Sequence, residues 1–291
     1  MDAVFTEAFE AQRPRLTRLA YRMLGSVAEA QDAVQDAWLR WTKAAAGVTD
    51  PAAWLVRVTT RLCIDRLRAA KAEREAYRGP WLPEPLIEPL TDDPVERAED
   101  VSVAFLLALE RLSPLERAVF LLHDVFDEDY ATVAQTLERT EPAVRQLASR
   151  AREHVREARP RFSVSQEEAG RLAAAFAAAS ASGDMAGLAS LLAEDAILVS
   201  DGGGKRKAAL RVLVGRADIV RLMEGLAWRS GGLNNVTDMR TARINGYPGL
   251  VLSFGDGPET IAFQPGDDGR IAAIYMVRNP EKLAHVAGAG S

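Results

Sequence analysis

The sequence of 291 residues contains few of the residue types that define several classes of protein. Its one cysteine, Cys63, excludes an internal disulfide framework, and a small buried residue is favoured there over a redox group. The three histidines (His123, His154 and His285) lack the spacing of metal ligands. The longest apolar runs are too short to span a bilayer, and no charged-then-apolar leader opens the chain. We therefore expect a cytoplasmic protein with no membrane span, metal or cofactor.

A basic total charge is also missing, because the net charge is −5. The charge is unevenly distributed along the chain. Residues 57–78 hold seven Lys/Arg against three Asp/Glu, residues 139–161 again hold seven against three, and residues 79–138 hold three against fourteen. Phosphate binding depends on local positive potential and not on the sum. Two basic segments separated by an acidic one keep nucleic acid as a candidate partner.

The segment 129–156 has the pattern of two helices joined by a tight turn. Thr140 can cap the second helix, and Pro142 falls in its first turn, where a missing N–H costs nothing. The predicted inward stripe of this helix consists of Val144, Leu147, Ala148, Ala151 and Val155. Arg, Gln and Ser occupy the remaining surface, as on the second helix of a helix-turn-helix, which lies in the DNA major groove. A solvated basic helix in a bundle is the alternative.

Three helices are predicted in the first 78 residues. The first covers residues 3–24, with a bend or a break at Pro14. The second, about 27–46, carries a surface stripe that mixes acids, an amide and a leucine: Asp32, Gln35, Asp36, Leu39 and Lys43. Such a stripe is either a solvated face or a docking face for another protein.

The third helix follows Asp50-Pro51 and places basic residues Arg57, Arg61 and Arg68 on one face. Trp54 belongs to its packed side. Aromatic and basic residues beside a loop suit the binding of unstacked bases and backbone phosphates.

Residues 79–100 contain five prolines in their first sixteen positions and no amphipathic period, which indicates a stiff, extended linker. Trp81 and Leu82 are unusual in a passive linker, since both side chains favour burial. We expect these two residues to dock on a folded domain.

The last part of the chain predicts an α+β domain. Helices are expected at 166–182, 185–196 and 215–228. Strands are expected at 196–200, 209–214, 236–244, 249–254, 260–264 and 271–277. Two or three helices on a curved antiparallel sheet would make a cone with a central cavity.

The segments AYRMLGSVAEAQDAVQDAWLRW, AAWLVRVTTRLCIDRLR and ALERLSPLERAVFLLHDVFDEDYATVAQTLERTEPAVRQLASRAR resemble the two domains of extracytoplasmic-function sigma factors. The resemblance implies two all-α domains that bind the clamp and flap of core RNA polymerase and recognise the −10 and −35 promoter elements. The predicted limits are 1–78 for the region 2 domain, 79–100 for the linker, 101–161 for the region 4 helix-turn-helix domain and 166–285 for the α+β domain.

The resemblance also implies roles for residues that match the family's motifs. Those matching the polymerase-binding segment are Asp32, Gln35, Asp36 and Leu39. Those matching the −10-reading helix are Trp54, Arg57, Arg61, Asp65, Arg66 and Arg68. Those matching the −35-reading positions are Arg145, Gln146, Ser149 and Arg150. Arg61 stands where Asn is frequent, and Gln146 and Ser149 are not the most common choices, which leaves the exact promoter sequence open. Arg favours guanine and Gln favours adenine, and both also bind phosphate.

The pattern FAAASASGDMAGLASLLAEDAILVSDGGG resembles the SnoaL-like branch of the NTF2-like superfamily. Three motifs, at 81–85, 201–205 and 279–283, further resemble the SigJ-like subgroup of sigma factors with a fused SnoaL-like domain. The subgroup implies regulation in cis in place of a separate anti-sigma factor. Its residues, which we expect where the extension meets the sigma core, are Trp81, Leu82, Pro83, Asp201, Gly202, Gly203, Gly204, Lys205, Asn279, Pro280 and Lys282. For the glycine-rich segment, a hairpin turn is the alternative.

Two other classes of function stay open. One is a one-component helix-turn-helix regulator with a ligand-sensing domain, and the other is a SnoaL-like enzyme with a DNA-binding appendage. The acid–base groups near the cone are Asp195, Asp201, Tyr275 and His285, and no pair has the spacing of a catalytic dyad. We expect no enzymatic activity, a free monomer, and a cavity that suits a small ligand.

Overall fold

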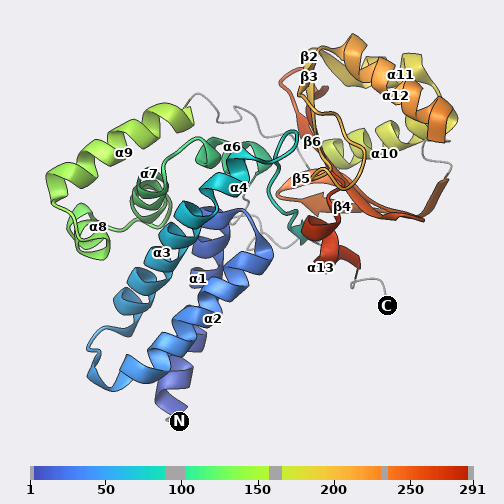
Figure 1. The fold of residues 1–291 in the computed structure, drawn as a ribbon. Helices are drawn as coiled ribbons and strands as arrows, with labels where there is room; N and C mark the ends of the chain where they lie inside the picture. Colours follow the sequence, from blue (N-terminus) through green and yellow to red (C-terminus); the bar gives the residue numbers. More distant parts are fainter. Residues whose placement is uncertain (1–2, 89–101, 157–165, 231–234, 288–291) are drawn as a thin grey trace. The chain divides into compact units, whose positions relative to one another are not determined.

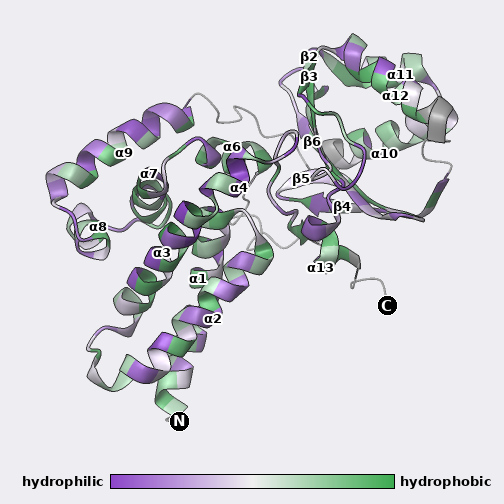
Figure 2. Ribbon diagram, viewed as in Figure 1, coloured by the Kyte–Doolittle hydropathy of each residue, from purple (hydrophilic) through white to green (hydrophobic). Residues whose placement is uncertain are grey.

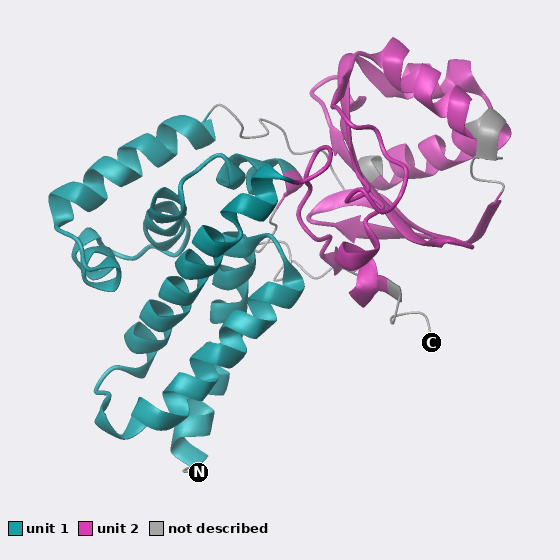
Figure 3. Ribbon diagram, viewed as in Figure 1, with its two compact units in different colours: residues 1–76, 104–159 teal, residues 77–103, 160–291 magenta. Residues whose placement is uncertain are grey.

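The computed structural model describes residues 3–88, 102–156, 166–230 and 235–287. The chain divides into two compact units, coloured separately in Figure 3: unit 1 is Met1–Ala76 with Ala104–Arg159, and unit 2 is Tyr77–Val103 with Pro160–Ser291. Parts of two predicted segments, residues 89–100 of the linker and 157–161 of the second helical domain, lie outside the described residues. Among the described helices, none is long and apolar enough to cross a membrane.

Unit 1 begins with three helices that pack against one another, α1 (Ala3–Leu24), α2 (Val27–Ala44) and α3 (Pro51–Ala69) (Figure 1). Two of them begin where sequence chemistry predicts. The Ser26 side chain accepts from the Glu29 amide at 3.1 Å, and Asp50 caps α3 with Pro51 in its first turn. Of the bend or break predicted at Pro14, the break is wrong, because α1 continues through this residue. Buried side chains on both sides of the proline hold the helix against α2 and α3.

Apart from α9, the remaining elements of unit 1 are short. After η1 (Ala45–Gly47) and α4 (Lys71–Glu75) come α6 (Val103–Glu110), α7 (Pro114–Phe120), a π-helical turn η2 (Leu121–Val125), α8 (Tyr130–Leu137) and α9 (Glu141–Arg156). Ser113 and Glu116 form a reciprocal capping box at the start of α7. The chain thus forms two groups of helices, α1–α4 and α6–α9.

The two helical groups of unit 1 contact each other through α3, which packs against α7 and α8. The Arg117 side chain is 3 % exposed and donates to the Met23 carbonyl at 2.5 Å and to Glu110 at 2.8 Å. Glu110 also accepts from Arg74 at 2.7 Å. Buried arginines need such partners, since a charge left alone in the interior is strongly destabilising.

Unit 2 contains one seven-stranded sheet with the order β1-β4-β5-β6-β7-β2-β3. Its strands are β1 (Ile87–Glu88), β2 (Leu192–Asp201), β3 (Leu213–Val214), β4 (Val236–Ile244), β5 (Tyr247–Phe254), β6 (Gly257–Pro265) and β7 (Ile271–Val277). Helices α10 (Gln166–Ser182), α11 (Met185–Leu191) and α12 (Arg216–Ser230) cover one face of the curved sheet, and η4 (Pro280–Leu283) with α13 (Ala284–Ala287) packs near β6 (Figure 1). The core includes Phe176 and Phe263, whose rings lie 4.7 Å apart.

Three details differ from the sequence-based expectations. The sheet is mixed and not antiparallel, because β2 and β7 pair in parallel. Parallel neighbours need a long connection, and here it contains α12 and the four strands β3 to β6, so no local turn signal reveals the pairing. The helix predicted at 185–196 ends at Leu191, where β2 begins, and the strand predicted at 209–214 is reduced to two residues. The predicted fold class of an all-α part with two groups of helices, followed by an α+β domain, is confirmed.

Candidate functional site

Helix α9 and the turn before it have the geometry of a helix-turn-helix. Asp129 caps α8 by accepting from the Thr132 amide at 2.6 Å. Glu138 ends α8 with a left-handed backbone (φ 54°), and the Val144 amide donates to the Thr140 carbonyl at 3.1 Å. The predicted inward stripe is buried, apart from Leu147, which is half-buried. The opposite face of α9 is therefore presented to solvent.

The four residues of α9 that match −35-reading positions are all exposed: Arg145, Gln146, Ser149 and Arg150. Arg145 lies over the Tyr130 ring, with its guanidinium carbon 4.2 Å from the ring centroid, and pairs with Glu141 at 3.4 Å. Arg152 instead bonds to Asp124 at 2.6 Å, which ties α9 to η2. Most of α9 is coloured hydrophilic in Figure 2.

Helix α3 carries the residues that match the −10-reading helix of the family. These residues do not form one exposed basic face. Arg61 pairs with Glu138 at 2.8 Å and donates to the Thr136 carbonyl at 3.2 Å, both at the end of α8. Trp54 is half-buried, with its ring 5.5 Å from that of Trp41. Asp65 and Arg68 are exposed and pair with each other, while Arg57 is half-buried. Ile64, which lies between Arg61 and Arg68 on the helix, is buried at 4 % exposure.

The stripe on α2 adjoins these α3 residues. Arg66 pairs with Asp36 at 2.7 Å, so a residue matched to DNA reading contacts one matched to polymerase binding. Asp32 and Gln35 are exposed, and the Leu39 side chain is 51 % exposed. An exposed leucine among polar groups suits a docking face, and single exposed leucines are also common on solvated surfaces.

Cys63 lies inside unit 1 with no exposed surface, as the sequence favours. Burial raises the pKa of its thiol to about 12, which outweighs the opposing effect of Arg66. Because the thiolate is the reactive form, we expect alkylation by iodoacetamide at pH 8 to be at least a hundredfold slower than for a free thiol, roughly as the lost thiolate fraction requires. Mass spectrometry of native and urea-unfolded chain measures this, and fast labelling of the native chain would contradict the burial.

The linker residues and the two C-terminal motifs meet in unit 2 as a group that we call the linker clasp: Tyr77, Leu82, Asp201, Asn279 and Lys282. The carboxylate of Asp201 accepts from the Tyr77 hydroxyl at 2.6 Å, the Leu82 amide at 2.8 Å and the Lys282 ammonium at 2.6 Å. Lys282 also donates to the Leu82 carbonyl at 2.5 Å, and the Asn279 amide donates to the Tyr77 hydroxyl at 2.9 Å. Both polar groups of the Leu82 backbone are bound.

The linker clasp is buried. Asp201 and Leu82 have no exposed surface, and Lys282 is 7 % exposed. The Lys282 ammonium lies 4.2 Å from the centroid of the Trp81 ring and 4.9 Å from that of Tyr77, so aromatic faces replace part of its lost hydration. The expectation that Trp81 and Leu82 dock on a folded domain is met within unit 2: Leu82 is fully buried and Trp81 half-buried.

The glycines that follow Asp201 fit this arrangement. The Gly203 amide donates to Asp201 at 2.9 Å. A Cβ at Gly203 would overlap the Asn279 side chain, and one at Gly202 would overlap the Arg206 carbonyl. Lys205 pairs with Glu281. Since β3 begins only at Leu213, the segment is a longer loop that closes on the linker clasp, and not a tight hairpin.

Three contacting residues had no sequence signal for this role. Tyr77 supplies the hydroxyl shared by Asp201 and Asn279. Asn245 accepts from the Leu86 amide at 3.1 Å and donates its own amide to the Leu86 carbonyl at 2.9 Å, and β1 pairs with β4. A ring nitrogen of His285 lies 2.9 Å from the Pro85 carbonyl oxygen. An Asn-Gly pair at 245–246 predicts a turn but not a linker contact.

The candidate acid–base groups are not assembled into a catalytic site. Asp201 is engaged in the linker clasp, His285 lies at Pro85, and the Tyr275 hydroxyl donates to Gln264 at 2.8 Å. Burial raises the pKa of Tyr275 above its ordinary value. Asp195 is exposed on β2.

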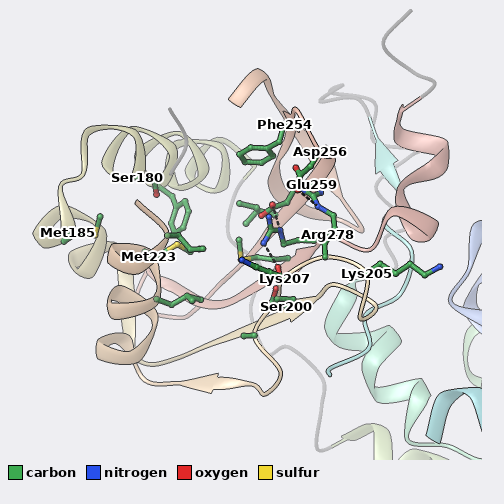
Figure 4. Close-up of a pocket in the computed structure, with 18 residues that line it drawn as sticks. Ser180, Met185, Ser200, Lys205, Lys207, Met223, Phe254, Asp256, Glu259 and Arg278 are labelled. Carbon is green, nitrogen blue, oxygen red and sulfur yellow. Dashed lines mark hydrogen bonds and ion pairs between the residues drawn. The ribbon is translucent and has the colours of Figure 1, made fainter. Parts of the chain in front are cut away.

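Unit 2 also contains a cavity of about 800 Å³, shown in Figure 4. It is lined by residues of α10, α11, α12, β2, β5, β6, β7 and the loop after β2. Glu259 lines it at 4 % exposure, with its carboxylate 2.8 Å from Arg278 Nε. Burial raises the pKa of Glu259, and the nearby Arg278 and Arg206 oppose that rise. The volume lies within the range of small-molecule sites.

Known proteins match this chain over nearly its whole length. Family models match residues 8–73 as "Sigma-70 region 2" and residues 102–155 as "Sigma-70, region 4". The ECF RNA polymerase sigma factor SigJ of Mycobacterium tuberculosis is 40 % identical over 292 residues, covering 94 % of this chain and 92 % of the relative. The probable ECF RNA polymerase sigma factor SigI of the same species is 36 % identical over 185 residues, covering 61 % of this chain and 63 % of the relative.

The solved structures include the crystal structure of M. tuberculosis SigJ, with a TM-score of 0.76, 36 % identity and coverage of 96 % of this chain and 98 % of that one. This likeness includes the α+β part of the chain as well as the helical part. With both sigma regions in order and a relative that is 40 % identical over nearly the whole chain, the chain belongs to the ECF RNA polymerase sigma factors, which bind core RNA polymerase and promoter DNA to direct transcription initiation.

Proposed function

We propose that the SnoaL-like domain regulates this sigma factor in cis through the linker clasp. The observation that carries the proposal is the buried carboxylate of Asp201, which holds the backbone of Leu82 together with Lys282. This linker joins the two regions that read DNA. A stretch of polypeptide spans at most about 3.3–3.6 Å per residue, so the chain between residues 76 and 103 reaches about 95 Å at most. With residues 77–88 fixed on unit 2, the remaining stretch reaches about 50 Å.

Shortening that reach limits where the −10-reading and −35-reading regions can sit at one time. The SnoaL-like domain therefore acts on the spacing between the −10-reading and −35-reading regions. Regulation of this kind does not need a separate anti-sigma factor. The proposed domain limits remain 1–78 for region 2, 79–100 for the linker, 101–161 for region 4 and 166–285 for the α+β domain. The free protein is proposed to be a cytoplasmic monomer without catalytic activity.

The test is promoter-dependent transcription in vitro with purified core polymerase. Tyr77→Phe removes the hydroxyl that donates to Asp201 and accepts from Asn279. Asn279→Ala keeps that hydroxyl and removes the side-chain amide that donates to it. We expect each variant to change the yield of transcript at least threefold while the circular dichroism and melting temperature of the chain stay near those of the wild type.

Asp268→Ala is the matched control, because it removes a carboxylate that pairs with Arg270 in the β6–β7 turn of the same unit. Its transcript yield should equal that of the wild type. Equal yields from Tyr77→Phe, Asn279→Ala and the control would reject regulation through the linker clasp. A chain that never directs initiation, intact or with its C-terminal part shortened, would favour the one-component regulator.

We also propose the residue assignments within unit 1. Asp32, Gln35, Asp36 and Leu39 form the face for the polymerase clamp, region 4 contacts the flap, Trp54, Arg57, Arg61, Asp65, Arg66 and Arg68 read the −10 element, and Arg145, Gln146, Ser149 and Arg150 read the −35 element. What supports these roles is the exposure of the α2 stripe and of the α9 face. Arg61 must leave Glu138 before it can contact DNA.

Leu39→Asp tests the polymerase face. The side chain is 51 % exposed, so the free energy of unfolding should change by no more than about 0.5 kcal/mol. Affinity for core polymerase should fall at least tenfold, because a charge would be buried in the interface. Val4→Asp is the control, since Val4 is 69 % exposed on α1. Equal affinity of both variants, measured by fluorescence anisotropy, would remove Leu39 from the interface.

The cavity favours a second role, the sensing of a small ligand by the SnoaL-like domain. Its volume of about 800 Å³ and its apolar wall fit a small molecule.

A further inference from the structure

One side of the cavity in unit 2 is apolar. Phe176, Met185, Met223 and Phe254 line it, together with Leu222, Leu226, Ile261 and Met276. Phe176 and Ile261 are at most 2 % exposed, which places them in the core of the domain. This wall offers a ligand no charged group, so it suits the hydrocarbon part of a molecule.

The other side of the cavity carries charges that are unequal in number. Asp256 pairs with Arg206, and Glu259 lies against Arg278. Lys205, at the loop, pairs with Glu281. Lys207 lines the cavity and is exposed, and among the described residues its ammonium has no carboxylate partner. Figure 4 shows Lys207 on the same side of the cavity as Glu259 and Arg278. The polar end therefore has one positive charge that no protein group balances.

A further polar atom in the wall lacks a protein partner. The Ser180 hydroxyl oxygen on α10 is buried, and no hydrogen bond satisfies it in the described part of the chain. A buried hydroxyl without a partner is unfavourable, so this position suits a polar atom of a bound molecule or of water.

The strands that form the cavity also hold the linker clasp. Side chains alternate between the two faces of a strand. Ser200 of β2 lines the cavity, and the next residue, Asp201, binds the linker. At the end of β7, Arg278 lines the cavity, and the next residue, Asn279, binds Tyr77. A shift at either strand end would reach both sites.

We propose that the cavity binds an amphipathic organic monoanion, an apolar molecule with one carboxylate, whose charge is balanced by Lys207 and whose binding is transmitted to the linker clasp through the ends of β2 and β7. The ligand class rests on the lining of the cavity alone. The transmission rests on the proposed regulation in cis.

The test uses the purified full chain and a matched pair of probes, 2-naphthoate and 2-naphthalenemethanol, with binding measured by calorimetry. The carboxylate should bind at least tenfold more tightly than the alcohol. Lys207→Glu should abolish this preference, and Arg221→Glu, the same change on the exposed surface of α12, should keep it. Ala209→Trp, on the loop that lines the cavity, should prevent binding of both probes.

Equal binding of the two probes, or binding of neither, would overturn the proposed ligand class. Hydrogen exchange of residues 77–88 then tests whether ligand binding is transmitted to the linker clasp. We expect the exchange rate of the Leu82 amide to change at least threefold when 2-naphthoate saturates the chain. Tight binding without that change would overturn the transmission and leave the ligand class standing. Altered transcription by Tyr77→Phe in that same case would show that regulation through the linker clasp holds without the ligand.

Discussion

Replacing Asp201 with alanine is expected to release residues 77–88 from the SnoaL-like domain. The change leaves the Lys282 ammonium buried without its carboxylate and removes the acceptor of the Leu82 amide. Breaking a buried pair by removing one partner costs about 3–5 kcal/mol. Hydrogen exchange at the Leu82 amide should therefore accelerate roughly a hundredfold or more, since exchange follows the free energy of local opening. Mass spectrometry of peptides from 77–88 measures it.

A double variant separates release of the linker from damage to the domain. The double variant Asp201→Leu with Lys282→Met removes both charges of the buried pair, and replacing a buried pair by apolar groups is often neutral for stability. The domain should then regain its melting temperature, while the Leu82 amide, which still lacks its acceptor, stays fast in exchange. Slow exchange at Leu82 in both variants would show that β1 and the Asn245 contacts hold the linker without Asp201. Asp268→Ala should leave exchange unchanged.

The sequence predicts the parts of this molecule whose signals are local. The stripe of α9 repeats with helical spacing, and its caps are short polar residues beside it, so the helix and its exposed face follow directly. The same holds for β4 and β7, which begin and end at the predicted residues. The parallel pairing of β2 with β7 has no such signal. The two strands become neighbours only when the roughly seventy residues between them have folded.

The linker clasp shows the same limit at the level of a site. The three motifs that mark it are recognisable in the sequence, and the structure brings residues of all three into contact. Tyr77 is absent from those motifs because it lies at the end of a basic segment that reads as part of a helix. Burial of Lys282 is also not evident from composition, since lysine is rarely buried unless it is paired, and its partner Asp201 lies 81 positions away in the chain.

Replacing Arg145 with alanine is expected to lower transcription in vitro, at a promoter that the chain recognises with core polymerase, by tenfold to a hundredfold. Arg145 lies in the first turns of α9, the part of a recognition helix that contacts base edges, and Tyr130 and Glu141 position its guanidinium. A bidentate contact between an arginine and a guanine contributes about 1–3 kcal/mol of discrimination. Arg145→Lys should not restore activity, because an ammonium lacks the planar fork of donors.

Arg156→Ala, the same loss of charge at the other end of α9, is the matched control. Loss of a contact to phosphate weakens binding at every sequence to a similar degree, whereas loss of a base contact matters only where its base is present. The Arg145→Ala defect should therefore shrink when the −35 element is replaced, and the Arg156→Ala effect should stay constant. A defect of Arg145→Ala that is equal on both templates would assign the residue to the DNA backbone, and promoter choice would then rest on Gln146, Ser149 and Arg150.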